Sequence, residues 1–176
     1  PRTIAAAAER AGLGMIGVVD HNAGWNATAA ASAAAKLGVA ALTGVEVTTV
    51  EELHVLVLFD DPDAAIAFGR RVFERMTAVP AAWFEEADQP VVNESGEVER
   101  FVPLWLGAPT DWTLTDLCGA VIECGGLCIP SHVDRPAMSI LSQLGRVPDL
   151  PFDAVEVSAA YDRQRDPAGL RGRWAM

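Results

Sequence analysis

The chain has 176 residues, of which 51% are hydrophobic and 21% are charged, and its mean hydropathy is +0.21. This composition is typical of one globular domain with a substantial core and excludes a disordered chain. The longest apolar runs are far shorter than the roughly 20 residues of a membrane span, so we expect no membrane partner. Three cysteines without a Cys-x-x-Cys pair favour a reducing compartment, and we expect a cytoplasmic protein.

The formal net charge is −11, from 24 acidic and 13 basic residues. Such a field repels polyanions, so the sequence disfavours duplex nucleic acid as a partner. It leaves open a phosphorylated small molecule or a nucleotide as the substrate, because bound metal ions would reverse the sign of the field locally.

Short buried strands alternate with helices along the chain, a pattern typical of an α/β protein with a parallel sheet or barrel. The periodicity and cap residues predict helices over 2–11, 22–37, 64–76, 113–124, 137–144 and 162–171. Strands are predicted over 14–19, 39–48, 53–59, 127–130 and 154–157, with a last one from 174. Residues 91–99 are predicted to form a peripheral hairpin, and the absence of a boundary predicts one domain over 1–176.

Polar side chains follow the first buried strand directly, in the stretch Val18-Val19-Asp20-His21-Asn22. The carboxyl end of such a strand is where α/β proteins place their chemistry. Asp20 could bind a metal, or it could accept a hydrogen bond that orients an imidazole. We favour the second role because adjacent strand residues point to opposite faces. Asn22 could contact a substrate, although capping the next helix is the more strongly favoured role.

A short turn between two predicted strands brings Glu46 near His54. If the turn centres on Val50, residue i pairs with residue 100 − i, and the Cβ atoms of Glu46 and His54 lie about 5 Å apart. Two side chains at that distance can share a metal ion. A slip of one residue would place them on opposite faces of the sheet.

All three histidines are predicted at strand ends or inside buried strands: His21, His54 and His132. One histidine in such a place is more often a core or capping residue, but three of them with Glu46 favour a ligand set. Histidine and carboxylate ligands suit zinc, manganese or iron rather than calcium.

Arg135 lies in the loop that follows His132. Its guanidinium could bind a phosphate in bidentate fashion or form a salt bridge with Asp134, and the sequence leaves both open. Gly125-Gly126 is too short for a phosphate-cradling loop, and no Gly-x-Ser-x-Gly elbow is present.

Four stretches resemble successive motifs of the PHP domain, the polymerase and histidinol phosphatase family: GLGMIGVVDHN (12–22), LTGVEVTT (42–49), EELHVL (51–56) and IPSHVDRP (129–136). The resemblance implies a distorted (β/α)7 TIM-like barrel with two or three divalent metal ions at the carboxyl ends of its strands. It also implies hydrolysis of phosphoesters by a metal-activated water. By motif, His21, Glu46, His54 and His132 fall on metal-ligand positions. Glu46 falls on the bridging carboxylate, and Glu46 and His21 are the candidate catalytic residues.

Two motifs of the family are not in this sequence: the Asp-Leu-His-x-His strand before the first helix and an Asp-x-His on a late strand. We therefore expect a domain that is truncated at both ends and carries about half of the ligand set. A non-catalytic PHP-like structural or regulatory module is the alternative to the hydrolase. A metal-dependent amidohydrolase on a similar barrel is a further alternative.

Overall fold

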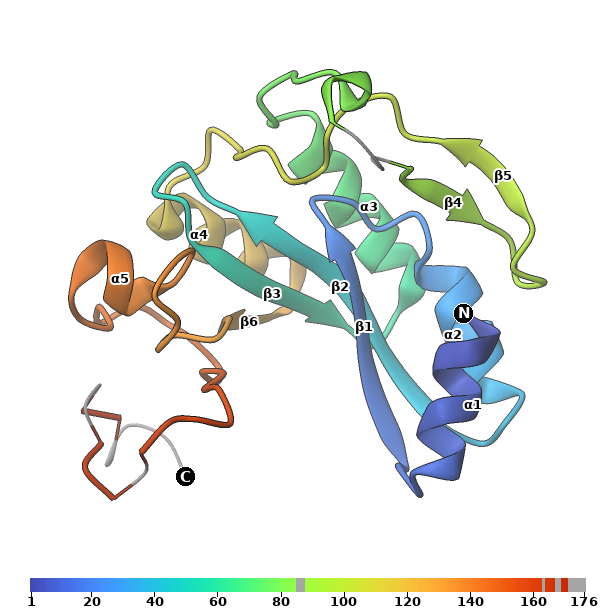
Figure 1. Ribbon diagram of the computed structural model, residues 1–176, viewed down its shortest axis with the longest axis horizontal. Helices are drawn as coiled ribbons and strands as arrows, with labels where there is room; N and C mark the ends of the chain where they lie inside the picture. The colour runs from blue at the N-terminus through green and yellow to red at the C-terminus, as the bar shows by residue number, and fades with distance from the viewer. Residues whose placement is uncertain (85–87, 163, 167–168, 171–176) are drawn as a thin grey trace.

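The computed structural model describes residues 1–84, 88–162, 164–166 and 169–170 of the chain. Its centre is a four-stranded sheet in the order β1–β2–β3–β6 (Figure 1). The strands are β1 (Met15–His21), β2 (Ala40–Thr48), β3 (His54–Phe59) and β6 (Leu127–Pro130). β1 runs parallel to β2, whereas β3 is antiparallel to both β2 and β6.

Cap residues fix the beginnings and ends of the principal helices. The Asp61 side chain accepts a hydrogen bond from the Asp63 backbone N–H at the start of α3. A capping box of Thr113 and Asp116 begins α4, and Gly125 ends it in the left-handed conformation. The helices are α1 (Arg2–Arg10), α2 (Ala27–Ala35), α3 (Pro62–Phe73), α4 (Leu114–Cys124) and α5 (Ile140–Leu144), with a 3₁₀ turn η1 (Ala81–Trp83).

The two faces of the sheet differ in chemistry because side chains alternate along each strand. One face is apolar and packs against α3 and α4. Fully buried residues of this layer include Val45, Val47, Val55 and Val57 of the sheet, Phe68 of α3 and Leu117 of α4. The opposite face carries Glu46 and His54. The hydrophobic core therefore holds the strands in place while the other face displays polar groups.

The register of the β2–β3 hairpin differs from the prediction by two residues. Glu46 pairs with Leu56, and His54 pairs with Thr48. The turn centres on Glu51 and not on Val50, as the hydrogen bond from the Thr49 backbone N–H to the Leu53 carbonyl shows. A shift of two residues keeps every side chain on its predicted face, so Glu46 and His54 share a face as predicted but are diagonal neighbours and not directly opposite.

The segment predicted as a hairpin over 91–99 forms β4 (Pro90–Val92) and β5 (Val98–Phe101), a separate two-stranded sheet. Its base packs on the start of α2, where the Asn26 side chain donates to the Pro90 carbonyl and accepts from the Val92 backbone N–H. The hairpin thereby lies beside the carboxyl end of β1 (Figure 1).

Several predicted elements differ in the structure. The four strands form an open, mixed sheet, and a closed barrel is not found among the described residues. Residues 153–156 run beside β6 through two backbone hydrogen bonds without being a regular strand. The described part of 162–171 consists of turns, not a helix, and the strand expected from 174 lies outside the described residues. None of the described helices has the length and apolar character needed to cross a membrane.

Gly44 tests the close approach of β2 and β3. A Cβ atom at Gly44 would lie 1.8 Å from the Val57 carbonyl oxygen, so Gly44→Ala must separate the two strands. We expect it to lower the free energy of unfolding by about 3 kcal/mol in urea denaturation. The matched control is Gly119→Ala in α4, where a Cβ meets nothing within 4 Å and should stabilise the helix by about 0.5–1 kcal/mol. Equal effects of the two substitutions would contradict the strand contact.

Candidate metal centre

The carboxylate of Glu46 lies among the three imidazoles that the sequence singled out. Its Oε2 atom is 3.6 Å from His21 Nε2, and its Oε1 atom is 3.4 Å from His54 Nδ1 and 3.8 Å from His132 Nε2. The rings of His21 and His54 lie edge to face with centroids 4.9 Å apart, and those of His54 and His132 are 5.4 Å apart. The structure thus brings together all four predicted metal ligands.

The distances of Glu46 to His21 and His54 suit ligands around an ion better than they suit hydrogen bonds. A good N–H···O bond measures about 2.7–3.2 Å, shorter than any of the three contacts. Two ligands at about 2.0–2.2 Å from a tetrahedral ion lie about 3.3–3.6 Å apart. The ligand atoms of His21, Glu46 and His54 all lie within 4.8 Å of one another, and His132 joins this group through Glu46.

Strand pairing positions most of the centre. His21, the last residue of β1, pairs with Glu46 of β2, and His54 begins β3. His132 follows β6 in a positive-φ conformation, with φ of 31°. Its backbone N–H donates to the Glu156 carboxylate at 2.9 Å, a contact that the sequence analysis missed. No local motif marks Glu156, because it reaches His132 only through the packing of 153–156 beside β6.

The electrostatics of the centre favour an ionised Glu46 carboxylate and a neutral His132 imidazole. Burial raises the pKa of Glu46, but the close contact with His54 and the charges of the three histidines outweigh it, so the pKa is lowered overall. Burial and the nearby Arg135 lower the pKa of His132. A charged carboxylate and a neutral imidazole are the protonation states that bind metals. In addition, the Nδ1 atoms of His21 and His132 are buried without a hydrogen-bond partner.

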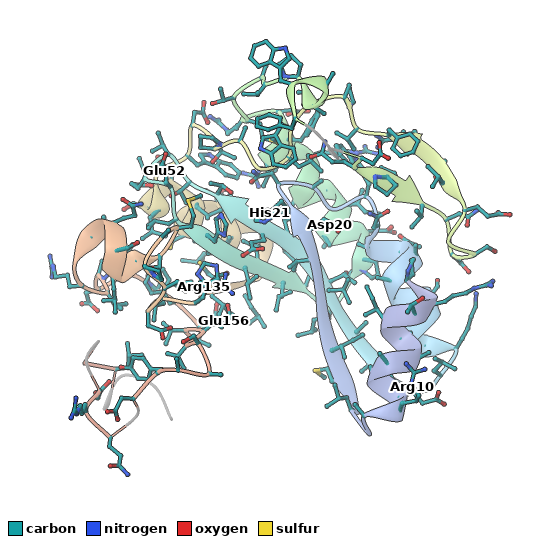
Figure 2. All side chains as sticks on the ribbon, in the orientation of Figure 1. Arg10, Asp20, His21, Glu52, Arg135 and Glu156 are labelled. Atoms are coloured by element: carbon teal, nitrogen blue, oxygen red, sulfur yellow. The ribbon has the colours of Figure 1, made fainter. Side chains whose placement is uncertain are left out.

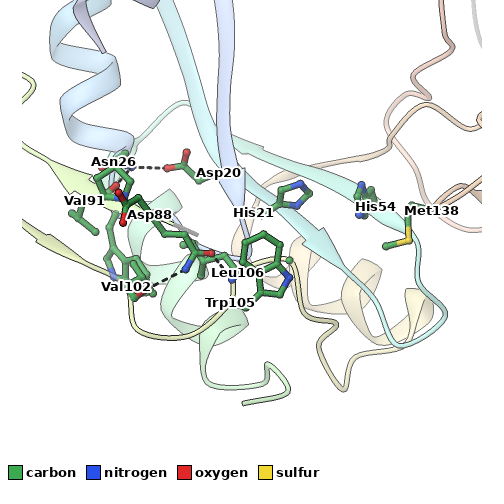
Figure 3. A pocket seen from close by; sticks show the side chains of 15 residues that line it. Asp20, His21, Asn26, His54, Asp88, Val91, Val102, Trp105, Leu106 and Met138 are labelled. Carbon is green, nitrogen blue, oxygen red and sulfur yellow. Dashed lines mark hydrogen bonds between the residues drawn. The ribbon is translucent and has the colours of Figure 1, made fainter. Parts of the chain in front are cut away.

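Asp20 lies on the other side of β1 from His21 (Figure 3). Its Oδ2 atom accepts a hydrogen bond from the Asn26 side chain at 2.9 Å, so the structure pairs it with Asn26 and not with an imidazole. Burial raises the pKa of Asp20, and the Asn26 contact offsets this only in part. The predicted role in orienting an imidazole is therefore not seen in this structure.

The Asn22 side chain joins backbone segments and does not cap the next helix. Its side chain is fully buried, donates to the carbonyls of Leu106 and Ala108, and accepts from the Thr48 backbone N–H. Every polar atom of the amide is thus engaged by the backbone. The following helix starts later than predicted, with Asn26 at the N-cap position.

Arg135 lies on the side of His21 that is away from Asp20, as Figure 2 shows. It lines a small cavity of about 240 Å³ together with His54 and His132. Asp134 instead accepts hydrogen bonds from the Ser158 hydroxyl and backbone N–H, at 2.6 and 2.8 Å. Among the described residues no ion pair joins Asp134 to Arg135, so the guanidinium stands beside the metal centre without that partner.

A larger cavity of about 690 Å³ opens on His21 and His54 (Figure 3). The hairpin region 88–107 supplies one wall, and the loop after β1 supplies another. Trp25 and Trp105 line this cavity, and neither was singled out by sequence reasoning. The clustering of tryptophans in loops was the only available signal.

Comparison with known proteins relates the fold to two solved structures. No protein-family model matches the sequence, and no curated protein matches it. The lesion-specific endonuclease EndoQ from Pyrococcus furiosus superimposes with a TM-score of 0.59 at 18% identity, over 92% of this chain and 38% of that chain. A protein of Bifidobacterium adolescentis described as a metal-dependent phosphoesterase superimposes with a TM-score of 0.55 at 17% identity, over 89% of this chain and 71% of that chain. At these identities the likeness establishes the fold, which agrees with the resemblance to the PHP domain.

The likeness to EndoQ contradicts one prediction. The net charge led us to disfavour duplex nucleic acid, yet a protein that shares this fold is a lesion-specific endonuclease. Net charge therefore does not exclude nucleic acid as a substrate class for this fold.

Asn22 provides a test of how the loop after β1 is held. Asn22→Ala leaves two carbonyls and one N–H unpaired in a buried place, so we expect it to lower the free energy of unfolding by about 2–4 kcal/mol. The matched control is Asn93→Ala, at an exposed hairpin turn, with an expected loss below about 1 kcal/mol. A similar loss in both variants, measured by urea denaturation, would show that the Asn22 network contributes little.

Asp134 gives a pH-dependent test of the link between the His132 loop and Ser158. Burial raises the pKa of Asp134, but the Ser158 hydrogen bonds lower it below the ordinary 3.8. A lowered carboxyl pKa stabilises the fold above pH 3.8, and this contribution declines as the pH falls through the folded-state value. We expect wild type to exceed Asp134→Asn in stability by about 1 kcal/mol at neutral pH. The difference should shrink near pH 3 in urea denaturation; a constant difference would disprove the link.

Proposed function

We propose that this protein is a metal-dependent phosphoesterase of the PHP type. The observation that carries the proposal is the arrangement of Glu46, whose two carboxylate oxygens approach different imidazoles. A carboxylate in this position can bridge two cations, with His21 on one side and His54 and His132 on the other. The fold likeness to a described metal-dependent phosphoesterase and to an endonuclease supports the same reaction class.

The residues present fit part of the ligand set of divalent zinc, manganese or iron ions, and we propose two or three such ions. Three imidazoles and one carboxylate, without cysteine, form a donor set suited to these metals. The orphaned Nδ1 atoms of His21 and His132 and the ligand-like spacing around Glu46 agree with it. Divalent ions held there would supply a bound water with a pKa of about 7 and would neutralise charge on phosphoryl oxygens.

The side chains have separate tasks in this proposal. Glu46 and His21 act as catalytic residues, because the His21 side chain is 42% exposed where the large cavity opens on the centre. His54 and His132 are more buried and hold the metals. Arg135 binds a phosphoryl oxygen from the small cavity, where Asp134 does not neutralise it. The sheet in this proposal is part of a (β/α)7 barrel of the PHP type.

The substrate in this proposal is a phosphoester, either of a small molecule or nucleotide or within a nucleic acid. The likeness to an endonuclease includes nucleic acids in this class. The metal centre itself requires only that a phosphoryl group reach His21 and Glu46.

Removal of the central carboxylate tests the proposal. Glu46→Gln should weaken Mn²⁺ or Zn²⁺ binding by about a hundredfold or more, since loss of even an outer partner of a ligand costs about 10–100-fold. Binding is measured by titration calorimetry, together with hydrolysis of a phosphomonoester, a phosphodiester and an amide. Glu94→Gln, at an exposed carboxylate paired with Lys36, is the control and should bind metal like wild type.

Three outcomes count against the proposal. Unchanged metal affinity in Glu46→Gln would show that Glu46 is not the central ligand of a metal site. Tight metal binding by wild type without phosphoester hydrolysis would favour the non-catalytic module, and hydrolysis of the amide alone would favour an amidohydrolase.

A further inference from the structure

The large cavity beside the metal centre is built unlike a phosphate site. Among the described residues that line it there is no lysine or arginine, and its charged groups other than histidine are Asp20 and Asp88. A phosphate group in this cavity, in addition to one at the metal centre, would meet two carboxylates and no lysine or arginine of the described lining. The cavity is thus electrostatically suited to the uncharged or cationic part of a ligand.

Its aromatic walls are held in place before any ligand arrives. The indole of Trp105 stacks on Phe84, with ring centroids 4.5 Å apart and planes at 23°. Gly107 lies against the indole edge, where a Cβ would be 2.7 Å from Trp105 Nε1. Fixed rings lose little conformational entropy when a ligand binds, which favours a flat, unsaturated group.

The second tryptophan is fixed in the same way. Trp25 lies edge to face with Phe73, with ring centroids 4.9 Å apart, and the Arg100 guanidinium lies 4.5 Å above the Trp25 ring. Trp25 therefore keeps a defined orientation at the cavity wall.

One acceptor in the cavity is unused. Asp20 Oδ2 is bound by Asn26, but no described residue donates to Asp20 Oδ1. Gln89 also lines the cavity, but its side-chain amide already forms hydrogen bonds with the backbone of Val102, Leu104 and Leu106. A ligand can therefore satisfy Asp20 Oδ1 only by donating an N–H or O–H group.

We propose that this cavity binds the organic part of the phosphoester, and that this part is a flat ring bearing an N–H donor. The ring packs against Trp105 and donates to Asp20, while the phosphoryl group reaches His21. A nucleobase and a small azole share this chemistry. The inference rests on the proposed function for the position of the phosphoryl group, and it adds the residues that select the substrate.

The experiment measures binding of phosphate-free probes to the metal-free chain in EDTA by titration calorimetry. Adenosine, cytidine and 4-(hydroxymethyl)imidazole carry a flat ring with N–H groups and distinguish a nucleobase from an azole. Benzyl alcohol has a flat ring without N–H, and ribose has neither feature. Imidazole-4-carboxylate tests rejection of an anion. We expect an N–H ring probe to bind about tenfold or more tightly than benzyl alcohol, ribose and the carboxylate.

Variants assign the binding to named side chains. Trp105→Ala should weaken binding of the ring probe about tenfold or more, whereas Trp105→Phe should retain most of the affinity. Gly107→Ala should also weaken it, because the added Cβ displaces the indole. Asp20→Asn keeps an oxygen for Asn26 and should weaken only the N–H probes. Trp83→Ala is the control, since Trp83 is 76% exposed and does not line the cavity.

The outcomes separate this inference from the proposed function. Ring probes that bind no better than ribose, or that bind equally well to wild type, Trp105→Ala and Gly107→Ala, would overturn it. Glu46→Gln should bind the ring probes like wild type, because the assay contains neither metal nor phosphate. Ring binding without metal-dependent hydrolysis would refute the proposed function alone.

Discussion

Glu46 lies on the polar face of the sheet because its neighbours Val45 and Val47 are buried on the other face. The rest of the centre depends on this alternation. A slip of one residue would drive the carboxylate into the apolar core and expose the valines, which is costly on both counts. The parallel pairing of β1 then places His21 beside Glu46, and β3 supplies His54. The centre is thus assembled mainly by strand pairing, which holds side chains more rigidly than loops do.

Features with a local physical cause could be predicted from the sequence. Helix α4 begins at the Thr113 capping box and ends at Gly125, and both signals lie within a few residues of the boundary they set. The hairpin turn could not be predicted in detail, because distant residues shape it. The Val50 backbone N–H donates to the Trp112 carbonyl, and the Glu51 carboxylate accepts from the Leu114 backbone N–H. Glu46 and His54 still lie on one face of the sheet despite this error, because the register shift was an even number of residues.

The failed inference from net charge has a physical cause as well. A total of −11 describes the field far from the protein, whereas a substrate at the centre meets three imidazoles and Arg135 within a small region. Screening limits surface charges to about 8–10 Å at ordinary ionic strength, so remote carboxylates contribute little there. The local charge pattern, which includes any bound cations, decides whether a polyanion can approach.

Two asparagines connect the wall of the large cavity to the strands that carry Glu46 and the histidines. The sequence does not distinguish these asparagines from ordinary loop residues. Asn22 fastens the end of β1 to the carbonyls of Leu106 and Ala108, and Asn26 fastens the hairpin at Pro90 and Val92. The wall itself belongs to a separate two-stranded sheet and its flanking loops. Changes within that segment can therefore alter the organic group that fits while the strands that carry the imidazoles keep their register. Under the proposed function, this arrangement assigns substrate selection to loops and the metal ligands mainly to a rigid sheet.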